Sequence, residues 1–516
     1  MEHVAELTAP RGASCATPGP APRGRPFAVP VAVVVPAAVM LFLGLWGLDR
    51  GTMWRDEAAT FQVARRSLPE IWRTLGHVDA VHGLYYLLMH PLLALRADET
   101  VLRLPSVVAA AVTAGLVGAI GSRLAGPRAG LWAGLLYAAT PFVSHYAQEG
   151  RSYALVAAGA ALATWLLLEA VERREPGRYG PWVAYAAVVA GTALLHEFAI
   201  LLLAAHGATL LLSRVPWRVW RGWGCAAAAA SVVLVPLAVV SQGQSEQVSW
   251  LRAPGPEQAG ALLDAFAGPQ TAVVTVTVLL AGLACVLPLP HTGRLGATQV
   301  ALPLAVVPPV LLYAASRWQP LFLDRYLLFC LAGVPLLAAA GAERILGLLP
   351  WRRLAAVAGV AAVAVAFVVQ LPQQERERLP ASRGDELARV AAVVDKQARP
   401  GDAVLFLPLH ERRISLAYPG AFTGLRDVAL ARSPAASGTL YGQETGALRL
   451  RDRLQQLAPR QRLWVVWDTT TVGTPWFRAQ RAETAKRAVL DALYREESTV
   501  FVRGGAVSIY TRIPRT

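Results

Sequence analysis

The sequence predicts a polytopic α-helical membrane protein with a small α/β domain at its C-terminal end. The 516 residues are 55% hydrophobic and only 16% charged, with a mean hydropathy of +0.41. Soluble domains, by contrast, have about 25% charged residues. Apolar runs of transmembrane length recur as far as residue 371. After residue 372 the composition changes to that of a soluble domain.

The apolar runs predict at least eleven membrane-spanning helices. They cover approximately residues 27–48, 102–122, 130–146, 152–171, 181–197, 198–213, 224–241, 270–290, 297–316, 321–341 and 354–371. The run 82–95 is too short for an ordinary span, so it is either a re-entrant or interfacial segment, or two of the other runs merge. We therefore expect about 11–13 transmembrane helices in a membrane domain over residues 26–372.

The distribution of arginine predicts how the chain is oriented. Residues 1–25 are rich in Pro, Gly, Ala and Arg, which predicts a disordered cytoplasmic tail. Further Arg clusters follow alternate spans, and the positive-inside rule places all of them in the cytoplasm. The predicted location of the protein is the plasma membrane. The first external loop is then 49–81, and residues 373–516 lie outside.

The region 373–516 has the pattern of an α/β domain. Residues 385–408 predict an amphipathic helix, a turn and a buried strand, and residues 462–468 predict a second strand. Residues 479–497 predict a helix, and 498–513 a hairpin around Gly504 and Gly505. No nucleotide-binding loop or metal-binding motif is visible, and no cysteine follows residue 371.

The net charge of +15 does not indicate a nucleic-acid partner. Nearly all of the excess is arginine at the ends of apolar runs, where membrane topology explains it. The expected non-protein surroundings are therefore membrane lipids.

An acidic pair, Asp56 and Glu57, follows the first span in "MWRDEAATFQ". One interpretation is that the pair caps a helix, because acids at a helix start and arginines at its end suit the helix dipole. The other is catalysis, since a partly desolvated carboxylate at the bilayer edge can serve as a general base. The neighbouring Arg55 could pair with an anion.

The remaining candidate residues gather on the predicted external face. Arg55, Arg103, Arg151 and Arg325 are candidates to bind an anionic group of a substrate, because a guanidinium can donate two hydrogen bonds to one such group. The candidates for contact with other parts of a substrate are Asp79, His82, Tyr86, Glu149, Tyr153, His196 and Tyr326. Solvated turns, interfacial anchoring and plain helix packing are the structural alternatives for these residues.

These motifs resemble the GT-C membrane glycosyltransferases. The "W-x-DEA" loop, followed by "DAVHGLYYLLMH", is similar to the first external loop of the branch with protein O-mannosyltransferases and lipid A aminoarabinose transferases, which is bacterial glycosyltransferase family 39-like. "VLRLPSV", "QEGRSY" and "DRYLL" follow in the same order, so the resemblance covers nearly the whole chain.

The resemblance implies transfer of a sugar from a polyprenyl-phosphate donor, with inversion, on the extracytoplasmic side. Asp56 and Glu57 match the acidic pair of that family. We assign the general base to Asp56, while Glu57 would orient the acceptor or hold a divalent cation, for which Asp79 and His196 are further candidate ligands. No cofactor is certain. The relatives often have His-Pro-Pro or Lys-Pro-Pro where this chain has "VHGLYY", which leaves open the acceptor and any metal role of His82.

The identity of the substrates and two other classes of function stay open. Mannose is the first candidate sugar, among hexoses and pentoses, and the acceptor is a protein, a polysaccharide of the cell envelope or a lipid. A transporter or flippase of lipid-linked sugars is one alternative, but such proteins favour ionisable residues near the bilayer midplane. A non-catalytic membrane anchor for an external binding domain is the other, and it leaves the ordered loop motifs unexplained.

Overall fold

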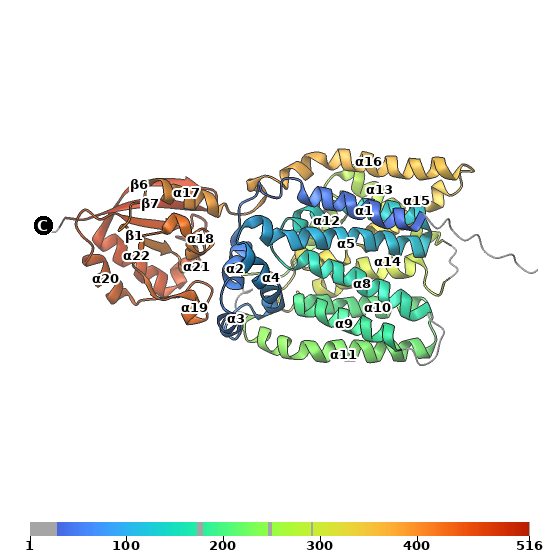
Figure 1. Cartoon of the computed structure of the whole chain (residues 1–516), viewed down its shortest axis with the longest axis horizontal. Helices are drawn as coiled ribbons and strands as arrows, with labels where there is room; N and C mark the ends of the chain where they lie inside the picture. The colour runs from blue at the N-terminus through green and yellow to red at the C-terminus, as the bar shows by residue number, and fades with distance from the viewer. Residues whose placement is uncertain (1–27, 173–178, 246–249, 290–292, 515–516) are drawn as a thin grey trace, which may run out of the picture.

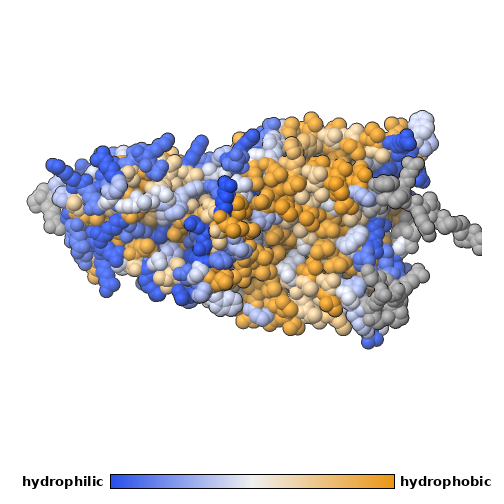
Figure 2. All heavy atoms as spheres, viewed as in Figure 1, coloured by the Kyte–Doolittle hydropathy of each residue, from blue (hydrophilic) through white to orange (hydrophobic). Residues whose placement is uncertain are grey.

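The computed structural model describes residues 28–172, 179–245, 250–289 and 293–514. The predicted tail, residues 1–25, lies outside the described residues. The described chain forms an elongated molecule in which a bundle of long helices carries a smaller α/β domain at one end (Figure 1). Hydrophobic residues surround the middle of the bundle, and hydrophilic residues gather at its ends and over the smaller domain (Figure 2).

Each predicted apolar run coincides with helical structure. The helices of the bundle are α1 (Ala28–Leu45), α5 (Glu99–Ala125), α6 (Pro127–Ala139), α7 (Pro141–Ala147), α8 (Tyr153–Glu172), α9 (Gly180–Leu195), α10 (Leu201–Leu212), α11 (Trp217–Gln242), α12 (Pro256–Ala267), α13 (Thr271–Val286), α14 (Ala297–Ala315), α15 (Gly333–Leu346) and α16 (Arg352–Arg376). Within the described residues, five helices are long and apolar enough to cross a membrane, or seven if each of two bent pairs is one span, and four shorter apolar helices accompany them. The predicted polytopic membrane fold is confirmed.

Several predicted spans are broken rather than straight. The run 130–146 divides into α6 and α7 because Thr140 is extended and Pro141 has no amide hydrogen to continue the helix. The run 321–341 begins as a 3-10 helix, η4 (Asp324–Cys330), and bends by 47° into α15. The region 242–269, which lies between two predicted apolar runs, contains α12, which meets α13 at 85°.

Small residues let the N-terminal helices pack closely. An added Cβ on Gly118 of α5 would lie 1.9 Å from the carbonyl oxygen of Ala32 in α1, and one on Gly134 of α6 would meet Pro36 of α1 at 2.6 Å. Backbones that approach this closely maximise van der Waals contact between apolar helices. The three helices therefore form a tight group on which the following elements are built.

The ambiguous run 82–95 forms α4 (Gly83–Leu95), preceded by the short 3-10 helix η1 (Ala80–His82). Helix α4 contacts α2 (Arg55–Ala64), α3 (Leu68–Leu75), α5 and α9. The labels α2, α3 and α4 all lie at the end of the bundle that faces the C-terminal domain (Figure 1). This end of the bundle holds most of the candidate site residues.

The C-terminal domain is a five-stranded sheet with the order β2-β1-β5-β7-β6. Strands β1 (Ala403–Leu407), β2 (Arg426–Asp427) and β5 (Leu463–Trp467) are parallel, whereas β6 (Tyr494–Val502) and β7 (Gly505–Arg512) form an antiparallel hairpin at one edge. A separate pair joins β3 (Leu430–Arg432) to β4 (Gln443–Glu444).

Helices cover both faces of this sheet. Alternate residues of β1 point to opposite sides: Val404 and Phe406 pack with α17 (Leu387–Gln397), whereas Leu405 and Leu407 share a core with α20 (Ala447–Gln455) and α22 (Arg481–Leu493). The short elements η6 (Leu409–Arg412), α18 (Arg413–Ala417), η7 (Pro419–Phe422), α19 (Pro434–Ser437) and α21 (Pro475–Ala479) complete the domain, and η5 (Pro380–Ser382) precedes it.

The predicted elements of this domain are present, with one boundary wrong. The helix expected over 479–497 ends at Leu493, because Tyr494 is already extended and starts β6. The Tyr494 side chain is buried, and its hydroxyl donates to the carbonyl oxygen of Leu454 at 2.9 Å. This tertiary anchor overrides the helical pattern of the sequence.

The core of the C-terminal domain continues into the bundle. One hydrophobic cluster contains Val390 and Phe406 of the domain together with Phe61 of α2 and Tyr85 of α4. The Met53 amide also donates to the hydroxyl of Tyr418 at 2.9 Å. The two parts therefore share an interface, which we call the junction.

Candidate active site

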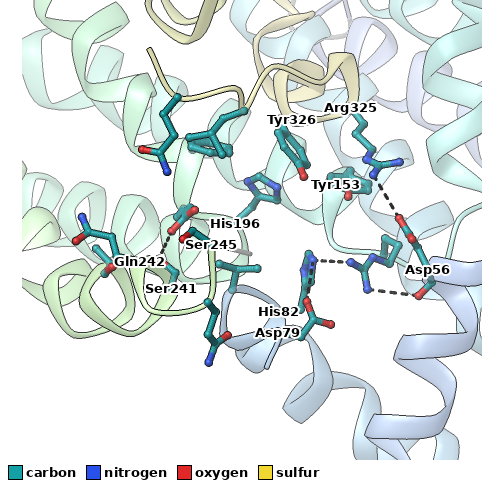
Figure 3. Close-up of a pocket in the computed structure, with 18 of the residues that line it drawn as sticks. Asp56, Asp79, His82, Tyr153, His196, Ser241, Gln242, Ser245, Arg325 and Tyr326 are labelled. Atoms are coloured by element: carbon teal, nitrogen blue, oxygen red, sulfur yellow. Dashed lines mark hydrogen bonds and ion pairs between the residues drawn. The ribbon is translucent and has the colours of Figure 1, made fainter. Parts of the chain in front are cut away.

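A cavity of about 390 Å³ opens beside α2 at the junction end of the bundle. Its walls come from segments that are far apart in the sequence: the starts of α2 and α8, the element η1, the 3-10 helix η2 (Glu197–Ile200), the end of α11 and η4. Eight of the predicted site residues line it: Asp56, Asp79, His82, Arg151, Tyr153, His196, Arg325 and Tyr326 (Figure 3).

Asp56 lies in the first turn of α2, where a carboxylate interacts favourably with the helix dipole. Its side chain remains 21% exposed. The nearest cation is Arg325, whose Nη2 lies 3.5 Å from Asp56 Oδ2, and the two groups face each other across the cavity wall (Figure 3). At this distance the contact is an ion pair without a well-formed hydrogen bond.

Arg325 is held mainly by aromatic rings. Its guanidinium carbon lies 5.7 Å from the ring centre of Trp54, 6.0 Å from that of Tyr153 and 5.8 Å from that of Tyr326. Such contacts orient a cation without using its hydrogen-bond donors. Among the described residues, the buried Arg325 Nε has no hydrogen-bond partner.

Arg151 is a second guanidinium at the same wall, and it is buried. Its Nη1 donates to the backbone oxygen of Asp56 at 3.4 Å and to Thr60 Oγ1 at 3.3 Å, and its Nη2 contacts His82 Nε2. Its Nε has no partner within the described parts of the chain. The two arginines therefore present positive charge and unused donors close to Asp56.

The other polar group of the cavity centres on η1. Asp79 has a left-handed backbone conformation, with φ at 61°, which is uncommon for a residue other than glycine. Its carboxylate accepts a hydrogen bond from Tyr86 and lies 3.7 Å from His82 Nε2. On the opposite side, the ring of His196 is 4.6 Å from that of Tyr326.

Glu57 points away from the cavity, into a paired site. Its Oε1 accepts from Arg103 Nε and from the amide of Gly150, both at 2.8 Å, and its Oε2 accepts from Arg103 Nη2 at 2.7 Å. Complete burial would raise the pKa of this carboxyl, but the charge and hydrogen bonds of Arg103 outweigh it and hold the pKa below 4.5. We call this bidentate pair the clamp.

Four other predicted residues also lie outside the cavity wall. Arg103 uses its remaining donors on the carbonyl oxygens of Leu48, Gly51 and Thr52, so it braces the loop before α2. Glu149 pairs with Arg383 at 2.6 Å, and Arg55 pairs with Asp385 at 3.1 Å, so both tie the bundle to the segment that leads into the C-terminal domain. Tyr86 is buried behind Asp79.

Several cavity residues gave no signal in the sequence. Ser241, Gln242, Gln244 and Ser245 at the end of α11, and Gln319 before η4, all line the cavity. Gln244 accepts from the Ala80 amide and donates to the Leu75 carbonyl, both at 2.9 Å, so it fixes the segment that carries Asp79. Uncharged amides at the edge of an apolar run are too common to single out.

The three candidate metal ligands of the sequence do not come together. Asp79 and His196 line the cavity, whereas both oxygens of Glu57 are engaged in the clamp. Within the described residues, the one close group of three potential ligand side chains lies elsewhere, in the C-terminal domain, and consists of His410, Glu411 and Asp468.

Comparisons with known proteins agree with this architecture. A family model described as dolichyl-phosphate-mannose-protein mannosyltransferase matches residues 84–241. ArnT from Cupriavidus metallidurans in the apo state superposes with a TM-score of 0.61 at 13% identity, over 93% of this chain and 98% of that one. The same protein bound to undecaprenyl phosphate gives a TM-score of 0.58 at 14% identity, over 92% and 97%. No curated protein sequence matches significantly.

These matches show that the chain has the fold of ArnT over nearly its whole length. The resemblance to GT-C membrane glycosyltransferases is thereby confirmed at the level of the fold. The identities of 13% and 14% are too low to transfer the role of any residue. Those roles are argued below from the chain's own geometry.

Proposed function

We propose that this protein is an inverting glycosyltransferase that moves a sugar from a polyprenyl-phosphate donor to an acceptor hydroxyl. The observation that carries the proposal is the position of Asp56, whose partly exposed carboxylate borders a cavity next to two guanidinium groups, the partly buried Arg325 and the buried Arg151. A lipid-phosphate sugar needs both features: a base for the acceptor and cations for the phosphate. The match to an undecaprenyl-phosphate-bound ArnT agrees with such a donor.

Asp56 would act as the general base. As the acceptor oxygen attacks the anomeric carbon, its proton moves to the Asp56 carboxylate, and the bond from that carbon to the phosphate oxygen breaks. The electron pair stays on the polyprenyl phosphate, and the configuration at carbon inverts. One carboxylate suffices, because a phosphate needs no protonation to leave, unlike the sugar alkoxide in a glycosidase.

Arg325 and Arg151 would stabilise the charge on the departing phosphate. Each has a buried Nε that, within the described chain, has no partner, so a phosphate oxygen can be bound without breaking an existing hydrogen bond there. Because Arg325 also faces Asp56 at 3.5 Å, the donor phosphate would compete with Asp56 for this cation. Donor binding would therefore release the carboxylate for its role as base.

The sugar would lie near the remaining polar side chains of the wall. Asp79, His82 and His196 border the cavity and offer acceptors and donors for sugar hydroxyls, or ligands for a divalent cation if one takes part. Mannose is the first candidate among hexoses and pentoses, since the matching family model is described as a mannosyltransferase. The acceptor would be a hydroxyl of a protein, a cell-envelope polysaccharide or a lipid.

We infer that the cavity and the C-terminal domain face the outside of the cell. Helix α16 begins at the end of the bundle far from that domain and runs towards it (Figure 1). Basic residues gather at that far end, where Arg128 contacts Glu343 and the Arg352 carbonyl, and Arg123 pairs with Glu169 and Glu172. A basic end belongs in the cytoplasm.

The orientation predicts which cysteines can be labelled from outside. In a variant with Cys15, Cys225, Cys285 and Cys330 replaced by Ser, Ala479→Cys in the C-terminal domain should react in intact cells with a membrane-impermeant thiol reagent. The matched variant Leu348→Cys, an exposed position at the opposite end, should react only after lysis. The reverse pattern would overturn the assignment.

The reaction itself is tested with purified full-length protein and a panel of polyprenyl-phosphate sugars. Release of the lipid phosphate, in the presence of candidate acceptors, is expected for one donor, with mannose tested first. Product analysis should show an inverted anomeric centre. A donor that binds and is never consumed, but crosses the bilayer of protein-containing vesicles, would favour the transporter instead.

A further inference from the structure

The C-terminal domain contains a cluster of three ligand-type side chains that the proposed sugar transfer does not use. His410 and Glu411 follow strand β1, and Asp468 directly follows β5, which pairs with β1 in parallel. Side chains at the carboxyl ends of adjacent parallel strands meet at one edge of the sheet, where α/β proteins bind their ligands. The Asp468 amide donates to the Leu407 carbonyl at 3.0 Å, which fixes the two strand ends together.

The distances in this cluster suit a small cation. His410 Nε2 lies 3.6 Å from Asp468 Oδ2 and 3.8 Å from Glu411 Oε1, and one ligand atom from each residue lies within 4.8 Å of the others. In a tetrahedral zinc site with bonds of about 2.1 Å, neighbouring ligand atoms are about 3.4 Å apart. The two distances from His410 are therefore within a few tenths of an ångström of this spacing, and the ligand atoms of Glu411 and Asp468 lie within 4.8 Å of each other.

The ligands are held in place and one of them is incompletely bonded. Asp468 accepts hydrogen bonds at 2.7 Å from the Thr470 amide, Thr470 Oγ1 and Thr471 Oγ1, which orient its carboxylate. The Glu411 side chain is 1% exposed, and its Oε2 has no hydrogen-bond partner within the described residues. A buried carboxylate oxygen without a partner is costly unless a ligand satisfies it.

The local charge also favours a cation. Arg413 contacts Glu411 at 2.5 Å and Asp385 at 3.9 Å, and Arg55 pairs with Asp385. Within the described residues, the buried Asp468 has His410 at 3.6 Å but no guanidinium within ion-pair distance. A neutral His410 adds no charge. The His410 side chain is 26% exposed, so an ion and a water ligand can reach the cluster from solvent.

We propose that His410, Glu411 and Asp468 form a binding site for a divalent cation of the zinc class, at the junction and outside the sugar-transfer cavity. One imidazole nitrogen and two carboxylate oxygens, with water as a fourth ligand, match the preferences of Zn²⁺. The chain Glu411–Arg413–Asp385–Arg55 links the site to the residue before Asp56. The ion would stabilise the contact between the C-terminal domain and α2.

The test measures zinc binding by the full-length protein, purified in detergent through a tag without histidine and stripped with a chelator. After addition of Zn²⁺ and dialysis, bound metal per chain is counted. We expect one zinc ion per chain in the wild type. His410→Gln and Asp468→Asn should each lower the affinity for this ion at least ten-fold, so that it is lost on dialysis. The control His77→Gln, an exposed histidine of the same molecule, should leave this ion in place.

Zinc should also raise the thermal unfolding temperature of the wild type and of the His77→Gln control, but not that of His410→Gln. This second measurement covers the case in which Asp468→Asn fails to fold. Zinc bound equally by the wild type and by both site variants would belong to another site, such as the cysteines or the histidines of the cavity, and would overturn the proposal, as would the absence of bound zinc. Neither measurement involves a sugar donor, so the result is independent of the proposed glycosyl transfer.

Discussion

Asp56 and Glu57 are neighbours in the chain, and each lies close to an arginine. The two surroundings differ in how completely their polar groups are hydrogen-bonded. In the clamp, both oxygens of the fully buried Glu57 are bonded at 2.7–2.8 Å. At the cavity, Asp56 meets Arg325 at 3.5 Å, and the buried donors Arg325 Nε, Arg151 Nε and His82 Nδ1 have no partner within the described chain.

This difference distinguishes residues that stabilise the fold from residues that are available to a substrate. Polar groups that satisfy one another inside a protein hold its parts in place, and burial makes their loss costly. Polar groups left with open bonding capacity beside a cavity are available to a ligand. By this criterion Asp56 is a candidate for catalysis, whereas Glu57 fixes the loop that carries Arg151 and the start of α2.

The largest expected effect is that of Asp56→Asn on sugar transfer. Removing a general base typically lowers the rate about 10²–10⁴-fold, and the amide keeps the shape of the side chain, so the unfolding temperature should stay unchanged. Release of lipid phosphate measures the rate. Asp49→Asn, an exposed acid in the same loop, is the control. Near-normal transfer by Asp56→Asn would refute the assigned base.

The same variant tests the competition for Arg325. Without the Asp56 charge, this guanidinium is free for the phosphate, so Asp56→Asn should bind polyprenyl phosphate at least as tightly as the wild type. Weaker binding would show that Asp56 supports the donor rather than competing with it.

Substitutions in the clamp should lower the stability of the fold rather than only the rate of transfer. Glu57→Ala leaves the Arg103 guanidinium buried beside an empty space, and loss of one partner of a buried pair costs about 3–5 kcal/mol. We expect a large fall in unfolding temperature in detergent, while the exposed Glu257→Ala changes stability by less than about 1 kcal/mol. A stable Glu57→Ala protein without transfer activity would instead place Glu57 in the catalytic machinery.

Arg325→Ala should weaken donor binding by about 10- to 100-fold, because a hydrogen bond to a charged group contributes about 1.5–3 kcal/mol. Titration with polyprenyl phosphate measures the affinity, and Arg317→Ala, an exposed arginine that donates to the Pro254 carbonyl, is the matched control. Affinity for the acceptor should change little. Equal donor affinity in both variants would contradict the phosphate role.

The sequence predicted the helices far better than it predicted which charged residues are paired inside the protein and which remain available to a ligand. Apolar runs are local signals, and each became helical, with breaks where Pro141 or the segment before α15 could not continue a span. Asp56, His82 and Arg325 could be found because acids, histidines and arginines at the edge of an apolar run stand out, unlike uncharged amides.

Partnerships between distant segments could not be predicted. Glu57 looks like Asp56 in sequence, and only the fold brings Arg103 and the Gly150 amide to it. The same holds for His410 and Asp468, which share no motif spacing and meet because β1 and β5 are adjacent in the sheet. Pairing of this kind depends on topology, and a single sequence carries no direct signal for it.

The smallest expected effect is a pH dependence that belongs to the clamp. The pKa of Glu57 is lower in the folded protein than its usual 4.5, so the ionised carboxylate stabilises the fold at every pH above about 4.5, and this contribution is lost as the pH falls through the folded value. The stability difference between wild type and Glu57→Gln should therefore be constant from about pH 7 to pH 5 and narrow at lower pH. Unfolding temperatures of both proteins across this range measure it. Buried acids that do not interact with Glu57 titrate alike in both proteins, so their contribution cancels in the difference. A gap that stays unchanged well below the folded pKa of Glu57 would show that the clamp does not depend on the Glu57 charge.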